Sequence, residues 1–241
     1  MKRYKNGLEL KCLHACLPII MIAADLINHM IPPLKPTDDG EKAIVWMEEL
    51  RTGQLPVIEK GNFLGFISED IILEENDKSK KVGEYELDDQ GCFVLEHQHF
   101  YDILKMASDF DSHLVSVLNV SGGFLGVVAI EDTIKAMADS TAVQDQGAIV
   151  VLQVNHRDYS LAEIARLVEG ENARILSVAV NHDSSDNSML RVTLKINETE
   201  VSHITASLER FGYKIIARFQ EDEVKTNDKE RYDLLMKYLN I

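Results

Sequence analysis

Basic residues are scarce in this sequence of 241 residues, which has 25 Lys and Arg against 40 Asp and Glu and a formal net charge of −15. Surfaces that bind nucleic acid or anionic lipid need clustered Lys and Arg. A general nucleic-acid or membrane surface is therefore not expected. A small anionic ligand in one local pocket is compatible with this charge.

Cysteine is also rare, and the three cysteines, Cys12, Cys16 and Cys92, are odd in number. A disulfide framework is not expected, and a reducing compartment such as the cytoplasm fits. The sequence also lacks a CxxC pair, the HExxH and Gly-x-Ser-x-Gly motifs, and a glycine-rich phosphate loop. These absences give no support to the common redox, hydrolase or nucleotide-hydrolysing enzymes. We expect a non-enzymatic protein without a resident cofactor.

The bulk composition is that of globular domains, with 45% hydrophobic and 27% charged residues. The length fits two domains of ordinary size. A chain this long buries enough surface to fold without disulfide or metal cross-links.

Both ends of the chain differ from the rest. Residues 1–23 carry Lys and Arg ahead of a short apolar run, Leu13 to Ala24, which contains Pro18. A signal peptide is one reading of this pattern, but we favour an N-terminal arm or an upstream extension ahead of a start at Met21. Residues 220–241 predict a short docking helix on a flexible tether, with a partner-binding tail as the alternative.

The first 140 residues contain an internal repeat. Residues 55–73 and 115–134 both have a β-rich run, a turn with glycine, the tripeptide Phe-Leu-Gly and a second apolar run. Each predicts a β-hairpin, because glycine supplies the positive φ that the turn needs. An acidic pair, Glu69-Asp70 or Glu131-Asp132, then opens an apolar helix, where carboxylates suit the positive end of the helix dipole.

A helix is also expected before each hairpin. In the first copy, Asp38 and Glu41 have the spacing of a capping box, and Gly53 is the expected stop. The matching apolar face in the second copy comprises Phe100, Ile103, Leu104, Ala107 and Phe110. Residues 24–80 and 81–140 therefore each predict the order strand–helix–strand–strand–helix.

This order, together with Leu55-Pro56-Val57-Ile58 and the segment from Gly65 to Asp70, resembles a tandem pair of CBS domains, also called a Bateman module. Members of that family commonly bind adenosine-containing ligands between the paired halves. The resemblance implies AMP, ADP, ATP or S-adenosylmethionine as a regulatory ligand. The candidate ligand-binding residues are Pro56, Val57, Gly65, Ser68, Asp70, Gly126, Ala129 and Asp132.

The family pattern places a Ser or Thr at the end of the second hairpin strand, against phosphate or ribose, and an Asp three residues later on the ribose hydroxyls. The first copy has Ser68, but Ile71 stands where the Asp should be and Asp70 comes one position early. The second copy has Asp132, but Ala129 replaces the hydroxyl. Two interpretations of Asp70 and Asp132 stay open, namely helix capping and ligand contact.

Residues 147–219 predict the order βαββαβ, a ferredoxin-like plan with an antiparallel sheet and two helices on one face. Ser160 with Glu163 and Asn197 with Glu200 have capping-box spacing at the two helix starts. The whole chain is thus expected to be mixed α/β and α+β.

The segment Leu161–Val168, followed by Asn172–Ile175, resembles the first helix and second strand of an ACT domain. ACT domains that bind amino acids usually carry Gly in the turn before this helix, where this chain has Tyr159 and Ser160. We therefore expect an ACT-like module that pairs two chains into a homodimer. A CBS pair followed by an ACT domain is similar in architecture to acetoin-utilisation regulatory proteins of the AcuB type.

The leading hypothesis is a cytoplasmic ligand-sensing regulator whose CBS-like pair binds an adenine nucleotide and reports to an unknown regulated protein through the ACT-like dimer. The second is an interaction scaffold whose pockets are degenerate. The third is a metal-dependent enzyme that uses His97 and His99 with Cys92 nearby.

Overall fold

The computed structural model describes residues 21–140, 142–183 and 186–220. The chain divides between Ser140 and Thr141 into two compact units. The N-terminal arm and the C-terminal helix expected from the sequence lie outside the described residues, except that Met21 and Ala23 are buried in the first unit.

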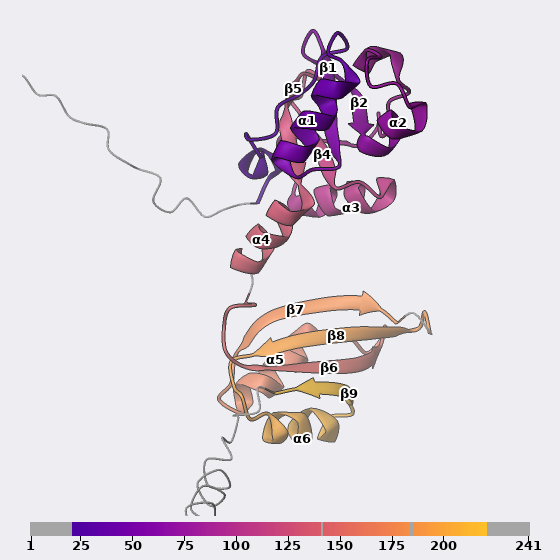
Figure 1. Ribbon diagram of the computed structural model, residues 1–241. Helices are drawn as coiled ribbons and strands as arrows, with labels where there is room; N and C mark the ends of the chain where they lie inside the picture. Colours follow the sequence, from indigo (N-terminus) through magenta and orange to yellow (C-terminus); the bar gives the residue numbers. More distant parts are fainter. Residues whose placement is uncertain (1–20, 141, 184–185, 221–241) are drawn as a thin grey trace, which may run out of the picture. The chain divides into compact units, whose positions relative to one another are not determined.

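The first unit contains both repeats (Figure 1). Its helices are α1 (Gly40–Leu50), α2 (Glu69–Glu75), α3 (Phe100–Phe110) and α4 (Ile130–Ser140), with short 3₁₀ turns at Ala23–Leu26 and Val82–Glu84. Its strands are β1 (Gln54–Glu59), β2 (Asn62–Ser68), β3 (Phe93–Leu95), β4 (Leu114–Leu118) and β5 (Phe124–Ala129).

The predicted hairpins are confirmed. Strands β1 and β2 pair antiparallel, and their two-residue turn, Lys60-Gly61, has positive φ at both positions. Strands β4 and β5 also pair antiparallel, and the Asn119 side chain accepts hydrogen bonds from two backbone N–H groups of the turn. Turn chemistry that is local in sequence therefore fixes both hairpins.

The first strand of each repeat is short. Strand β3 pairs parallel with β4, but in the first repeat the equivalent pairing is a single bridge between Leu34 and Val57. The prolines at positions 32, 33 and 36 surround Leu34, and proline has no N–H to donate to a ladder. This composition explains why the first repeat forms a bridge where the sequence predicts a strand.

Both expected ends of α1 are wrong by one or two residues. The cap at its start is Asp39, which accepts from the Lys42 N–H, while Asp38 bonds the Lys42 ammonium. The helix ends at Arg51 in the left-handed conformation, with φ of 54°, and not at Gly53.

The two repeats meet at the tips of their hairpins. Asn62 and Gly123 form a bridge, and the Phe124 N–H donates to the Gly61 carbonyl at 2.8 Å. The rings of Phe63 and Phe124 stack beside this bridge, with centroids 6.3 Å apart. The duplicated segments thus face each other, as the repeat predicts.

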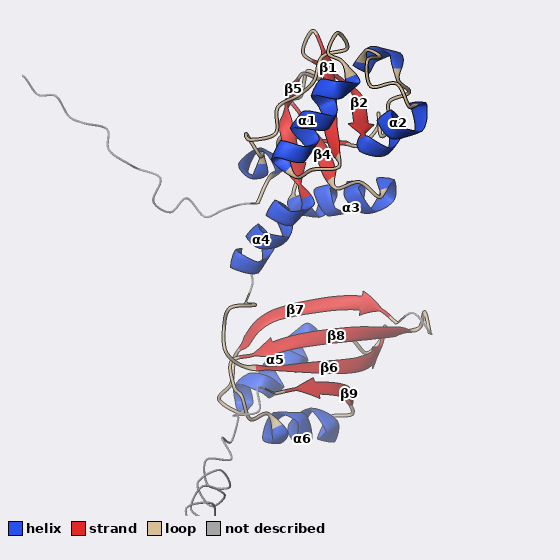
Figure 2. Ribbon diagram, viewed as in Figure 1, coloured by secondary structure: helices blue, strands red, loops and turns tan. Residues whose placement is uncertain are grey.

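The second unit consists of β6 (Ala148–Asn155), α5 (Leu161–Gly170), β7 (Ile175–His182), β8 (Met189–Ile196), α6 (Ser202–Arg210) and β9 (Lys214–Phe219). All neighbouring strands are antiparallel, in the order β7-β8-β6-β9. Figure 2 shows α5 and α6 on one face of this sheet, where they bury one apolar core. The predicted ferredoxin-like order is confirmed.

The two capping boxes predicted here have different outcomes. Ser160 caps α5 by accepting from the Glu163 N–H at 3.3 Å. The box at Asn197 and Glu200 is wrong, because α6 begins later and follows Val201. The Asn197 side chain instead accepts from the Arg174 N–H at 2.6 Å and ties the helix-to-strand turn to the end of β8.

Candidate functional site

A cleft of about 480 Å³ lies in the first unit where both repeats contribute residues. Its polar lining residues are Asn28, Arg51, Thr52, His113, Glu131 and Asp132. Its apolar lining residues include Met30, Ile31, Leu50, Leu114, Ile130 and Ile134. The volume falls in the range of small-molecule sites, roughly 300–1,000 Å³.

The Asp132 carboxylate is held at the edge of this cleft. The Asn28 amide donates to Asp132 Oδ2 at 2.8 Å, and Asn28 Oδ1 accepts from the Met30 N–H at 2.9 Å. The amide is therefore oriented by a turn on one side and fixes the carboxylate on the other. The bond recorded for the Asp132 carboxylate among the described residues is therefore with a side chain and not with a backbone N–H of α4.

Gly126 allows Asn28 to reach this position. A Cβ on Gly126 would lie 2.5 Å from Ile27 Cγ2, so only glycine lets the segment around Ile27 lie this close to β5. The Asn28 N–H donates to the Val127 carbonyl at 2.8 Å. Gly126 therefore acts through packing, because it lets Ile27 lie close to β5 and so places Asn28, the next residue, beside Val127.

Helix α4 begins differently from α2. In the first repeat the Ser68 hydroxyl accepts from the Ile71 N–H, so Ser68 and not Asp70 is the cap of α2. In the second repeat Ala129 holds the equivalent place and has no side-chain oxygen to accept such a bond. The first turn of α4, which lines the cleft, therefore starts without the cap that its counterpart has.

The equivalent place in the first repeat is arranged differently. Ile71 stands where the second repeat has Asp132. Its side chain packs against the hydrophobic core formed around α1 and β1. The backbone of Asp88 forms an antiparallel bridge with Phe66, just as the backbone of Asn28 does with Val127, so Asp88 is the counterpart of Asn28. The polar pair of the second repeat thus has no counterpart here, because one partner is replaced by an apolar side chain.

The structure brings together only part of the predicted set. Ala129 and Asp132 line the cleft. The other predicted residues lie elsewhere in the described chain: Pro56 and Val57 in β1, Gly65 in β2, Gly126 in β5, Ser68 at the α2 cap and Asp70 exposed in α2. Sequence reasoning missed Asn28, Arg51 and His113.

Cys92 and His99, two of the three residues of the metal hypothesis, have other environments in the structure. Cys92 is fully buried, and burial, followed by the negative charge of Asp89, raises the pKa of its thiol to about 11. His99 Nδ1 accepts from the Tyr101 N–H at the start of α3. In the part of the chain that the structure describes, no three His, Cys, Asp or Glu side chains are grouped as a metal site. In the same part, no helix is long and apolar enough to span a membrane.

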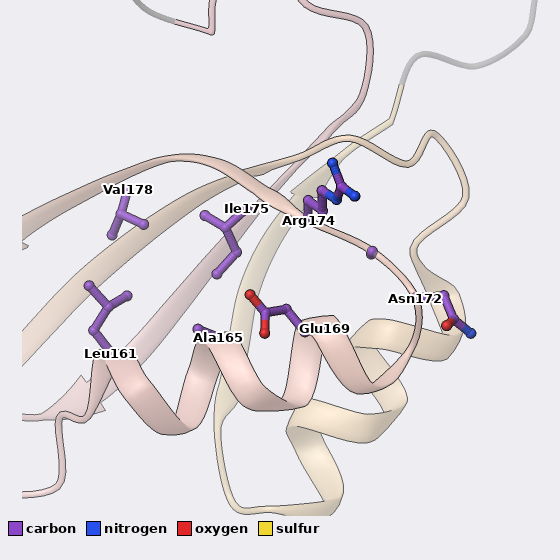
Figure 3. Close-up of a pocket in the computed structure, with 8 residues that line it drawn as sticks. Leu161, Ala165, Glu169, Asn172, Arg174, Ile175 and Val178 are labelled. Atoms are coloured by element: carbon purple, nitrogen blue, oxygen red, sulfur yellow. The ribbon is translucent and has the colours of Figure 1, made fainter.

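The second unit has its own groove, between α5 and the edge strand β7. Figure 3 shows Leu161, Ala165 and Glu169 along α5, facing Ile175 and Val178 of β7. Arg174 and Asn172 lie in the turn that joins the two elements. The groove is mainly an apolar strip beside the edge of a sheet, with charged groups at one end.

Comparison with known proteins gives structural matches over about half of the chain, and no family model matches it. One match is a CBS domain pair/ACT domain protein from Thermotoga maritima, with 16% identity, a TM-score of 0.46 and coverage of 50% of this chain and 98% of that one. Another is the protein CBSX2 in complex with AMP, with 16% identity, a TM-score of 0.43 and coverage of 49% and 96%. A third is the CBS domain of a bacterial CNNM/CorC family Mg²⁺ transporter in complex with ATP, with 19% identity, a TM-score of 0.42 and coverage of 49% and 87%.

Proposed function

We propose that the first unit binds one adenosine-containing nucleotide in the Asp132 cleft and that the protein is a regulator that reports this binding. The observation that carries the proposal is the combination of a positioned carboxylate with an apolar wall in one cleft lined by both repeats. A nucleoside presents the same combination, a ribose diol and a flat base.

The apolar part of the cleft fits the base. Met30 and Ile134 line it although 76% and 56% of their surfaces are exposed. Covering such side chains with a planar ring removes apolar surface from water, at about 25 cal/mol per Å² buried. Ile31 and Leu50 extend the same wall.

The polar part fits the ribose. A carboxylate accepts hydrogen bonds from two vicinal hydroxyls, and charge-assisted bonds of this kind are about twice as strong as neutral ones. Asn28 occupies one oxygen of Asp132 and holds the group in place, which leaves Oδ1 toward the diol in this proposal. A fixed acceptor binds at a lower entropic cost than a mobile one.

The regulatory step is a population shift between arrangements of the two repeats. The cleft takes Arg51 and Thr52 from the first repeat and Asp132 from the second, so a ligand that contacts both favours the arrangement in which they are close. Gln54 Nε2 already donates to Ser112 Oγ across the repeats at 2.7 Å, and ligand binding would reinforce this contact.

We further propose that the second unit forms a homodimer through strand β7. This strand is at one edge of the sheet, spans eight residues and has mostly exposed side chains, including Val180 at 41%. Antiparallel pairing of β7 with β7 of a second copy gives hydrogen-bond partners to the unpaired backbone groups of this edge strand. It also covers the groove beside α5. Sedimentation velocity checks this, with Val180→Lys expected to yield monomer and Ile216→Lys, on the opposite edge strand β9, expected to stay dimeric.

A thermal-shift panel with AMP, ADP, ATP and S-adenosylmethionine tests the nucleotide proposal. AMP and ATP are chosen first because the matched structures hold these ligands. At least one ligand should raise the unfolding temperature of the native chain. Asp132→Asn should lose most of that shift, while Asp109→Asn, the same change on the exposed surface of α3, should keep it.

The scaffold hypothesis is the second candidate, and the first repeat favours it. Ile71 already occupies the position of the ribose carboxylate there. If no ligand of the panel shifts the unfolding temperature while the dimer persists, the nucleotide proposal fails and the scaffold remains.

A further inference from the structure

The sheet of the second unit has one face that carries no helix of the described part of this unit. Its two helices, α5 and α6, both lie on the other face (Figure 2). An antiparallel sheet with helices on one side leaves its second face to water or to another element. The side chains on this second face, here called the open face, show which of the two applies.

The strand register identifies the side chains of the open face, because residues directly paired across neighbouring strands point to the same side of a sheet. On β6 and β8 these positions alternate with those of the buried core. Three rows cross the sheet from β7 to β9: Ser177, Lys195, Ile149 and Phe219; Ala179, Thr193, Val151 and Ala217; and Asn181, Arg191, Gln153 and Lys214.

The centre of the open face is apolar. Val151 is buried between its neighbours, Ile149 and Ala217 are half-buried, and Phe219 at the end of β9 is 61% exposed. Covering such a strip removes apolar surface from water, at about 25 cal/mol per Å² buried. Because the strip lies on the face of the sheet and not at its edge, the proposed pairing of β7 strands leaves it open.

The open face is also cationic, although the net charge of the chain is −15. Its three rows contain Arg191, Lys195 and Lys214 and no Asp or Glu. Arg191 pairs with Asp183 at 3.6 Å. Lys195 and Lys214 donate to neutral oxygens and belong to none of the ion pairs recorded among the described residues. A segment that is apolar and acidic would therefore complement this face.

The chain itself supplies a segment of this chemistry. Residues 221–241 follow β9 after a single residue and begin with an acidic run at 221–223. Tyr232, Leu235 and Leu239 come later, at the spacing of one helix face. A helix of about ten residues is marginal in water by itself. The amphipathic part of this segment therefore needs a surface to pack on.

The dimensions of the sheet suit this segment. Phe219 stands two strands away from Lys195 in one row, which is roughly 10 Å and within reach of three extended residues. Residues 221–231 can span up to about 36 Å. A helix from Tyr232 to Ile241 would be about 15 Å long, and the outer strands of a four-stranded sheet are roughly 14 Å apart.

We propose that residues 221–241 dock on the open face of the sheet in their own chain. The acidic run at 221–223 pairs with Lys195, and the apolar side of the helix packs over Ile149 and Phe219. The segment then covers the face opposite α5 and α6. The groove between α6 and β9 is a poorer match for an acidic segment, because Glu209 lines it.

Hydrogen exchange of the full chain, read by mass spectrometry on peptides from residues 228–241, tests the proposal. Amide exchange at least tenfold slower than in an unstructured chain is expected, because docking is what stabilises so short a helix. Thr193→Glu places a longer, negatively charged side chain at the centre of the open face and should bring the rates to within twofold of the unstructured rates. Ala206→Glu adds the same charge in the groove between α6 and β9 and should keep the protection.

Leu235→Glu makes the corresponding change in the segment and leaves the sheet itself unaltered. It should also remove the protection of residues 228–241, while the amides of β6 and β8 exchange as slowly as in the native chain. This variant decides the matter if Thr193→Glu loosens the sheet. Unprotected amides in the native chain, protection that survives Leu235→Glu, or loss in Ala206→Glu but not in Thr193→Glu would overturn the proposal. Protection that disappears on dilution would place the segment on a second copy and would also overturn it.

Discussion

Gly126→Ala is the substitution that most sharply tests how the cleft is assembled. The new methyl group would lie 2.5 Å from Ile27 Cγ2, well inside van der Waals contact, while Gly126 itself is buried in β5. Ile27 packs against the core of the second repeat, so it cannot move freely. Overpacking of this kind costs about 1–3 kcal/mol of the free energy of unfolding. Relief by movement of Ile27 would pull Asn28 away from Val127 and from Asp132.

The assay is urea unfolding followed by the fluorescence of Trp46, the only tryptophan of the chain, which lies in α1 of the same unit. Gly53→Ala is the control, since a Cβ there meets nothing within 4 Å. Ile27→Ala removes the clashing methyl, so the double variant with Gly126→Ala should be more stable than the sum of the single changes by about 1 kcal/mol or more. Simple additivity, or a Gly126→Ala variant as stable as the control, would refute the close-packing argument.

Three further predictions concern titration and stoichiometry. With the other two cysteines replaced by Ser, Cys92 should react with a thiol reagent at pH 8 only as fast as the unit unfolds, because its thiol is buried with a pKa of about 11; rapid labelling of the native chain would contradict this. Burial and the Glu163 carboxylate raise the pKa of Tyr213 to about 12, so the unfolded state loses this proton first and stability should fall by at most about 1.4 kcal/mol per pH unit between pH 10 and pH 12. Tyr213→Phe should lack this slope in urea unfolding followed by circular dichroism, and an unchanged slope would be evidence against it. Asp70→Asn should leave nucleotide affinity unchanged in calorimetry, since Asp70 lies outside the cleft lining, and a tenfold loss would place a second site in the first repeat.

The hairpins and the ferredoxin-like order could be predicted because their signals are local. The Lys60-Gly61 turn and the alternation of β8 are both readable within a few residues. Helix ends were less predictable. Asp39 is preceded by another Asp, and Arg51 takes a conformation that the sequence would assign to Gly53.

The site was predictable only in part, for a related reason. Asp132 was found because a family pattern marks it. Its partner Asn28 is 104 residues away in sequence and belongs to no motif, so only the folded chain brings the two together. Arg51 was missed because its relevance depends on the left-handed turn after α1, which had been assigned to glycine. The sequence shows an Arg near the predicted end of α1, but it does not show that this residue lines the cleft.

The stoichiometry of AMP binding, measured by calorimetry on the native chain and on Asp132→Asn, tests the central claim most directly. The account predicts one AMP per chain, because Asp132 and Asn28 are paired in the second repeat while Ile71 replaces the carboxylate in the first. It also predicts that Asp132→Asn loses at least tenfold in affinity, as expected for a charge-assisted hydrogen bond. Two equivalent sites per chain, or one site that Asp132→Asn leaves intact, would contradict it.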